Sequence, residues 1–122
     1  MRERLFRFQY LTPKKVNRGG EVIWEYPATE IGIAFVQENE APLHHHNQTR
    51  EWYIVTRGQG AVEVEDRSYS LVPGDVLYIP PGLKHKARKT APHFEMFVIS
   101  SPPFSTEDYF LDEHPAKRGK SF

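Results

Sequence analysis

The residues of this chain that could most directly do chemistry are three histidines and a glutamate in two separate segments. His44, His46 and Glu51 lie in the polar segment 44–51, and His85 follows a Pro-Pro-Gly bend later in the chain. Neutral imidazole and carboxylate groups are the usual protein ligands of divalent transition metals. If the four side chains converge, they make a four-ligand site that leaves coordination positions open for chemistry.

The local spacing can bring the first three side chains to one place. Side chains alternate between the two faces of a β-strand, so His44 and His46 point the same way and His45 points away. The polar stretch 47–50 can turn the chain before Glu51, which opens a run of strand-forming residues. His85 can join them only through the fold, and a His-x-His pair by itself is a weak indication of a metal site.

Taken together, the two segments resemble the two sequence motifs of the cupin superfamily. The first family motif is His-x-His, three or four residues, Glu, six residues and Gly, and it matches His44, His46, Glu51 and Gly58. The second is Gly, five residues, Pro, one residue, Gly, two residues and His, and it matches Gly74, Pro80, Gly82 and His85. The motif core covers residues 44–89, with only the 15 residues 59–73 between the two motifs.

This resemblance implies one cupin domain over residues 1–122, with the all-β fold of a double-stranded β-helix, or jelly-roll barrel. It assigns the role of metal ligand to His44, His46, Glu51 and His85, with one divalent transition metal ion as cofactor. The donor set suits Fe(II), Mn(II), Ni(II), Co(II) or Zn(II), and the sequence does not choose among them. No other cofactor is implied.

Two positions depart from the family pattern. The Gly that usually precedes the first motif is Glu38 here, and the Asn that usually closes the second motif is Lys89. Neither position holds a metal ligand in the family. Lys89 shares strand parity with His85 and could face an anionic ligand at the mouth of the barrel, although its place in a basic run favours an exposed position.

The remaining sequence predicts short strands and almost no helix. Alternating or apolar runs are separated by Pro, Gly and Asn, a pattern typical of β-sandwiches and barrels. The predicted strands are 5–9, 21–26, 31–37, 51–56, 60–65, 68–71, 76–79, 85–89 and 94–100. After Ser100 we expect an irregular tail with one helical turn, because Ser105 is followed by acidic residues, and the segment 109–111 can dock that turn on the barrel.

Three further residues are weaker candidates for a substrate pocket. Tyr53 shares a strand face with Glu51, and Tyr78 precedes the Pro-Pro bend, so either hydroxyl could meet a bound ligand; such tyrosines are more often core or rim residues. Glu95 faces solvent if its apolar neighbours face the core, and it becomes a candidate general base in the opposite register. We assign no catalytic residue from the sequence.

Composition excludes several classes of function. Basic and acidic residues number 16 each, so no overall positive field attracts nucleic acid or an anionic membrane. The chain has no cysteine and therefore neither disulfides nor thiolate ligands. No apolar run reaches the length of a membrane span or a secretory signal, and we expect a cytoplasmic protein. Phosphate-binding glycine loops and the serine-nucleophile motif are also absent.

These features favour a small metalloenzyme acting on an oxygenated small organic substrate, with dioxygenase-, isomerase- or decarboxylase-like chemistry. The alternative is a non-catalytic, metal-containing barrel that binds a small molecule or a sugar. Proteins of the family commonly form dimers, and we expect a homodimer in which the aromatic-rich segment 5–10 adds an edge strand to its partner.

Overall fold

The computed structural model of the chain describes residues 2–16 and 19–113, and these residues form an all-β structure. The strands are, in chain order, β1 (Lys14–Val16), β2 (Glu21–Glu25), β3 (Gly32–Gln37), β4 (His44–His45), β5 (Arg50–Val64), β6 (Arg67–Leu71), β7 (Val76–Ile79), β8 (His85–Ser101) and β9 (Phe110–Leu111). Two short 3-10 turns accompany them, η1 (Phe8–Tyr10) and η2 (Thr106–Asp108). No helix in these described ranges is long and apolar enough to cross a membrane.

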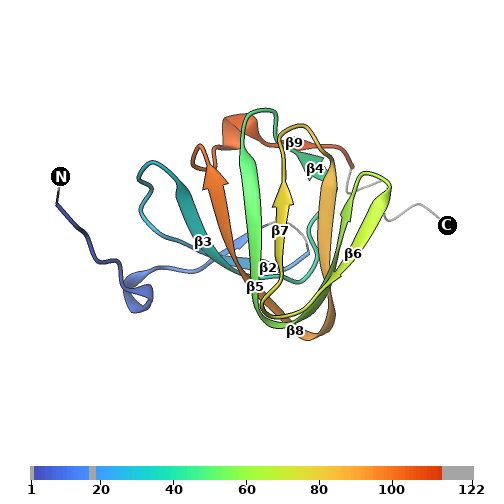
Figure 1. Cartoon of the computed structure of the whole chain (residues 1–122). Helices are drawn as coiled ribbons and strands as arrows, with labels where there is room; N and C mark the ends of the chain where they lie inside the picture. Colours follow the sequence, from blue (N-terminus) through green and yellow to red (C-terminus); the bar gives the residue numbers. More distant parts are fainter. Residues whose placement is uncertain (1, 17–18, 114–122) are drawn as a thin grey trace.

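The strands are antiparallel and curl into a barrel, with β4 and β9 at one end of it (Figure 1). Their order is β1-β2-β3-β8-β4-β9, and β5 pairs in addition with β6, β7 and β8. Two long strands organise this arrangement, because β5 and β8 pair with each other along most of their length. Each therefore runs through both halves of the barrel.

The sequence predicts two separate strands where β5 lies and two more where β8 lies, and in each place the structure has a single strand. The pairing between β5 and β8 shifts register on both sides of Gly58 instead of ending there. Gly58 has a positive φ of 78°, and a Cβ atom on it would collide with the carbonyl of His93. A Cβ on Gly60 would collide with the ring of Phe94. The glycines thus bend the strand where the sequence suggests a loop.

The predicted strand at residues 5–9 is wrong. This segment forms no strand, and its end enters η1. Phe8 instead packs on the outer aromatic side chains of the β2–β3 hairpin, with ring centroids 5.3 Å from Trp24 and 5.6 Å from Phe35. Within the chain, aromatic packing takes the place of backbone pairing here, and the homodimer stays a prediction.

The inner face of the barrel is apolar at its centre. Its most deeply buried side chains include Val55, Val62, Ile79, Phe94 and Met96. Because Phe94 and Met96 point inward, Glu95 between them points outward, which is the register that the sequence favours.

The C-terminal segment folds back over the end of the barrel that carries β4. The predicted helical turn is present as η2, and its cap is Ser105, whose hydroxyl accepts a hydrogen bond from the N–H of Glu107 at 3.2 Å. Beyond it, β9 pairs with β4, so that His44 lies opposite Leu111. This short pairing places the tail beside the histidine motif.

Candidate metal centre

The structure brings the four predicted ligands together at one end of the barrel. One potential ligand atom from each of His44, His46, Glu51 and His85 lies within 4.8 Å of the others, and all four side chains are buried. His44 on β4 and His85 on β8 are direct partners in the antiparallel ladder, which is how the fold recruits the distant histidine. Glu51, in the second position of β5, faces both strands.

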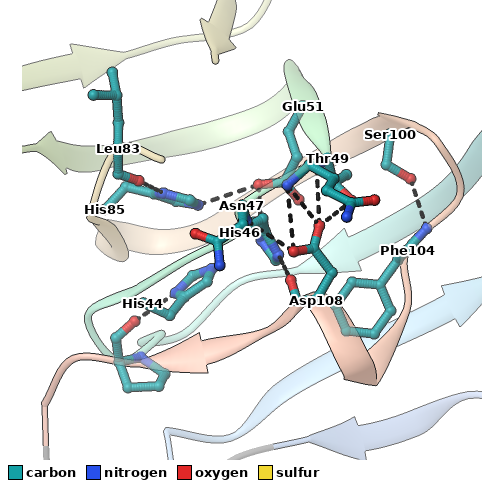
Figure 2. A network of polar contacts seen from close by, with 12 residues as sticks. His44, His46, Asn47, Thr49, Glu51, Leu83, His85, Ser100, Phe104 and Asp108 are labelled. Atoms are coloured by element: carbon teal, nitrogen blue, oxygen red, sulfur yellow. Dashed lines mark hydrogen bonds and ion pairs between the residues drawn. The ribbon is translucent and has the colours of Figure 1, made fainter. Parts of the chain in front are cut away.

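Backbone carbonyl groups fix the orientation of all three histidine rings (Figure 2). The Nδ1 atoms of His44, His46 and His85 lie 2.8, 2.7 and 2.9 Å from the carbonyl oxygens of Pro42, Asp108 and Leu83, respectively. A carbonyl oxygen can only accept, so each Nδ1 carries the hydrogen and donates it. Each Nε2 atom then has its lone pair free for another partner.

Two of these Nε2 atoms, those of His46 and His85, meet the carboxylate of Glu51. Its Oε1 atom lies 3.1 Å from Nε2 of His85 and 3.4 Å from Nε2 of His46. Within the described part of the chain, Nε2 of His46 is also the buried side-chain nitrogen that has no hydrogen-bond partner. Lone pairs and a carboxylate that face one another in a buried site need a positive charge between them, either a proton or a metal ion.

The electrostatics keep two of these groups in the forms that bind a cation. Burial, followed by the charge of His85, lowers the pKa of His44 to about 4, so its ring is neutral near pH 7. Burial acts to raise the pKa of Glu51, but hydrogen bonding with His46 and His85 outweighs it and holds the pKa at about 2. At His46, burial acts to lower the pKa, but the hydrogen bond with Glu51 outweighs it and raises the pKa, so a proton and a metal ion compete for the space beside Glu51. The neutral ring of His44 and the ionised carboxylate of Glu51 are forms that bind a divalent transition metal.

A family model identifies the family from the sequence. The model of the cupin domain matches residues 35–100, more than half of the chain. The chain belongs to the cupin family. It is 31% identical over 67 residues to the uncharacterized protein MJ1618 of Methanocaldococcus jannaschii, a match that spans about half (54%) of each chain. It is 29% identical over 84 residues to an uncharacterized protein of Aquifex aeolicus, covering 69% of each.

Solved structures with the same fold confirm the jelly-roll barrel. KdgF from Halomonas sp. has a TM-score of 0.76 at 20% identity, covering 87% of this chain and 98% of its own. A variant of Streptomyces PAC13 solved with uridine has a TM-score of 0.78 at 16% identity, covering 92% of each chain. For oxalate decarboxylase from Bacillus subtilis these values are 0.74 and 20%, covering 88% of this cupin and 31% of that chain. At such identities the likeness is one of fold.

Aromatic side chains from two parts of the cupin barrel surround the histidine cluster. Tyr53 is buried on β5, with its ring centroid 6.2 Å from that of His85. Tyr109 comes from the tail, and its ring centroid lies 5.0 Å from that of His44. Phe104, which is half-exposed, stands 6.0 Å from the ring of His46. The sequence predicts only the first of these neighbours, because the tail reaches the site through folding and no local motif marks it.

Two other candidates for the substrate pocket do not lie at the cluster. Tyr78 is on the outer face of β7, 46% exposed, with its ring 5.1 Å from that of Trp52. Its neighbour Ile79 takes the inward position, and alternation turns Tyr78 outward. Glu95 also lies on the outer face, where a carboxylate oxygen is 3.6 Å from the guanidinium of Arg57.

Two polar side chains near the motifs point away from the site. His45 faces away from the cluster, as its parity predicts, and its Nδ1 atom lies 2.7 Å from a carboxylate oxygen of Asp112. Lys89 is exposed on β8, opposite Gly60 of β5 in the ladder. Its exposed position matches the expectation from its basic surroundings.

A second buried carboxyl group lies on the β2–β3 side of the barrel. Glu38 replaces the glycine usual in the family and is 7% exposed. The pairing of Val22 with Gln37 places Glu21 opposite it. Burial, followed by the hydrogen bond with Glu21, raises the pKa of Glu38 well above its ordinary value. The interior thus holds two buried glutamates with different partners.

Proposed function

We propose that this cupin binds one divalent transition metal ion and acts as a small metalloenzyme on an oxygenated small organic substrate. The ligands are the Nε2 atoms of His44, His46 and His85 together with the carboxylate of Glu51. The observation that carries the proposal is the orientation of the three clustered rings. Their Nδ1 atoms all donate to backbone carbonyls, and the Nε2 atoms of His46 and His85 turn toward the carboxylate of Glu51. That arrangement suits a metal better than it suits hydrogen bonding.

The site can supply binding and orientation around such an ion. When bound, a divalent ion acts as a Lewis acid on substrate oxygen atoms. Burial, followed by the charge of Glu51, raises the pKa of Tyr53 well above 10, so its hydroxyl keeps its proton and can donate it to a bound oxygen. The rings of Phe104 and Tyr109 border the cluster and limit the access of water.

The structural neighbours support a lyase or related reaction without fixing it. One is described as a nucleoside dehydratase, and another is an oxalate decarboxylase with Mn(II) centres. The expected reaction types, oxidation by O₂, isomerisation and decarboxylation, all use a metal that holds adjacent oxygen atoms of a substrate. Because one fold carries many reactions, the ion and the substrate must be identified by experiment.

Metal analysis of purified protein tests the proposal directly. We would measure bound metals by elemental mass spectrometry in untagged protein purified without nickel resin, beside His85→Ala and the matched control His93→Ala. His93 is an exposed histidine on the same strand. We expect about one divalent ion per chain in the wild type and the control, and its loss in His85→Ala. A wild type without metal after reconstitution would contradict the proposal.

The identity of the ion then directs the search for activity. Iron or manganese calls for oxygen-uptake and decarboxylation assays, and zinc, nickel or cobalt calls first for isomerisation and dehydration assays on hydroxylated compounds. A metal-loaded protein that binds such compounds and turns none of them over would favour the alternative, a non-catalytic binding barrel.

A further inference from the structure

One acidic residue of the C-terminal turn is tied to the loop that joins two predicted ligands. The carboxylate of Asp108 accepts hydrogen bonds from the backbone N–H groups of Asn47, Gln48 and Thr49 at 2.8, 3.1 and 2.9 Å. It also accepts one from the hydroxyl of Thr49 at 2.9 Å (Figure 2). Three successive N–H groups that converge on one anion fix the loop's backbone conformation.

The same residue also holds a histidine ring. The backbone carbonyl of Asp108 accepts the hydrogen of Nδ1 of His46 at 2.7 Å. The loop 47–49 lies between His46 and Glu51. Asp108 therefore binds both the ring of His46 and the segment that leads to Glu51. Thr49, which bonds the carboxylate of Asp108 through both its N–H and its hydroxyl, is only 3% exposed. One residue of the tail therefore fixes both the ring of His46 and the loop that follows it.

The charge state of the carboxylate suits this task. The slight burial of Asp108 acts to raise its pKa, but the hydrogen bonds from Asn47, Thr49 and Gln48 outweigh it and lower the pKa. An ionised carboxylate accepts stronger hydrogen bonds than a neutral group does.

We propose that Asp108 is a positioning residue of the metal centre, which aims Nε2 of His46 at the ligand cluster and sets the loop that carries the chain to Glu51. The proposal rests on the proposed function for the metal, whereas the positioning is a property of the metal-free chain. Asp108 contacts no predicted ligand atom directly and acts through His46 and through the loop.

A purely structural role would be to fasten the tail to the barrel, but the tail has other attachments. Strand β9 pairs with β4, and Asp112 contacts His45 at 2.7 Å. These contacts remain when the carboxylate of Asp108 is changed. Its loss should therefore act on the loop and on His46 more than on the position of the tail.

The test compares Asp108→Asn with Glu107→Gln. The asparagine keeps the shape of the side chain, removes its charge and turns an NH₂ group toward N–H donors. Glu107 is an exposed acid in the same turn, so its variant controls for the loss of one negative charge near the site. Circular dichroism checks that both variants fold.

Two readouts apply to each protein. Long-range ¹H–¹⁵N NMR of the metal-free protein at alkaline pH reports which ring nitrogen of each neutral histidine carries the hydrogen, with His46 assigned by a His46→Gln spectrum. Calorimetric titration with Co²⁺ reports affinity. For Asp108→Asn we expect the freed loop to let the ring of His46 move away from the carbonyl of residue 108, so that His46 loses its uniform Nδ1–H form. The affinity should then fall about 10- to 100-fold, the range usual when the partner of a metal ligand is lost. His44 and His85 should keep their Nδ1–H forms, and Glu107→Gln should match the wild type.

The outcomes separate this proposal from the proposed function. Wild-type protein that binds no Co²⁺ defeats the metal site, and the NMR comparison alone then decides whether Asp108 positions His46. An unchanged His46 signal and unchanged Co²⁺ affinity in folded Asp108→Asn would overturn the positioning role. If that variant does not fold, Thr49→Val removes one of the four hydrogen bonds, and we expect a smaller change in the same two readouts; no change in either would also overturn it.

Discussion

Two glutamates in this barrel are buried to the same extent, yet the pKa values of their carboxyl groups are shifted in opposite directions. Glu38 and Glu51 are each 7% exposed, and burial acts to raise the pKa of both. At Glu51, hydrogen bonding with His46 and His85 outweighs burial and holds the pKa at about 2. At Glu38, the hydrogen bond with Glu21 adds to the effect of burial.

The difference shows that the partners of a buried carboxyl group, more than its depth, decide what it can do. The imidazoles of His46 and His85 keep Glu51 ionised, which is the form that binds a cation. At Glu38, burial and the carboxyl group of Glu21 on β2 favour the protonated form. The end of the barrel at β4 is therefore suited to hold positive charge, while the β2–β3 side is suited to packing. The following predictions test this division.

The largest effect is expected at the ionised glutamate. Glu51→Gln should lower the affinity for Co²⁺ by more than about 100-fold, because the loss of an outer partner alone costs 10- to 100-fold and this change removes a charged ligand. Calorimetric titration measures it. Glu63→Gln is the control, since Glu63 lies on the same strand and its carboxylate is 3.8 Å from the ammonium group of Lys86 on the surface. Equal affinities for Co²⁺ in the two variants would contradict a cation site at the β4 end of the barrel.

The second effect concerns Glu38, whose pKa is raised, and it depends on pH. The folded-state pKa of Glu38 lies above its unfolded value, so the wild type loses stability as pH rises from the unfolded pKa through the folded one. Glu38→Gln cannot lose a proton and escapes this penalty. We expect the variant to exceed the wild type by about 1–3 kcal/mol in free energy of unfolding near pH 8 and to approach it near pH 4.

Urea unfolding of the metal-free proteins across this pH range measures the difference. A gap between Glu38→Gln and the wild type that stays constant with pH would show that the carboxyl group of Glu38 does not titrate anomalously. The affinity for Co²⁺ should be the same in both proteins.

A smaller effect is expected where the N-terminal segment docks. Phe8→Ala should lower the free energy of unfolding by about 1 kcal/mol, because it removes aromatic contacts with Trp24 and Phe35 while leaving the interior intact. Thermal unfolding should show a lower Tm with unchanged Co²⁺ affinity. A loss of affinity would mean that the β2–β3 side and the metal end are not independent.

The smallest effect is expected at an exposed ion pair on the same side. The ammonium of Lys14 lies 3.6 Å from a carboxylate oxygen of Glu25, and both side chains are at least half exposed. Lys14→Ala should change the free energy of unfolding by less than about 0.5 kcal/mol, as is usual for exposed pairs. Urea unfolding measures this difference. A change in the free energy of unfolding well above this limit would contradict the view that Lys14 forms only an exposed ion pair.

The sequence predicts the all-β class and the four residues of the cluster, and the reasons are physical. Strand alternation is a local property. The two motifs place three histidines and a glutamate at fixed spacings, a combination that few sites other than metal centres need. The helical turn at Ser105 was predictable for the same reason, since an N-cap is a short-range signal.

Other features escape prediction because they depend on distant partners. Asp108 meets Thr49 across 59 positions of the chain, and no pattern around either residue indicates the contact. Strands β4 and β9 have only two residues each, too short for alternation to show. The segment 5–9 has the composition of a strand but finds aromatic partners on the outer face, and tertiary packing overrides its local preference.

The long pairing of β5 with β8 has a consequence for how the protein is made. Glu51 lies beside Ser100 at one end of this ladder, and His85 lies beside Val64 at the other. The two residues meet only after both strands have curled around the core, and we expect such non-local contacts to complete the cluster late in folding. A chain stopped before that point has no place for the ion, and the uptake of metal would report that folding is complete.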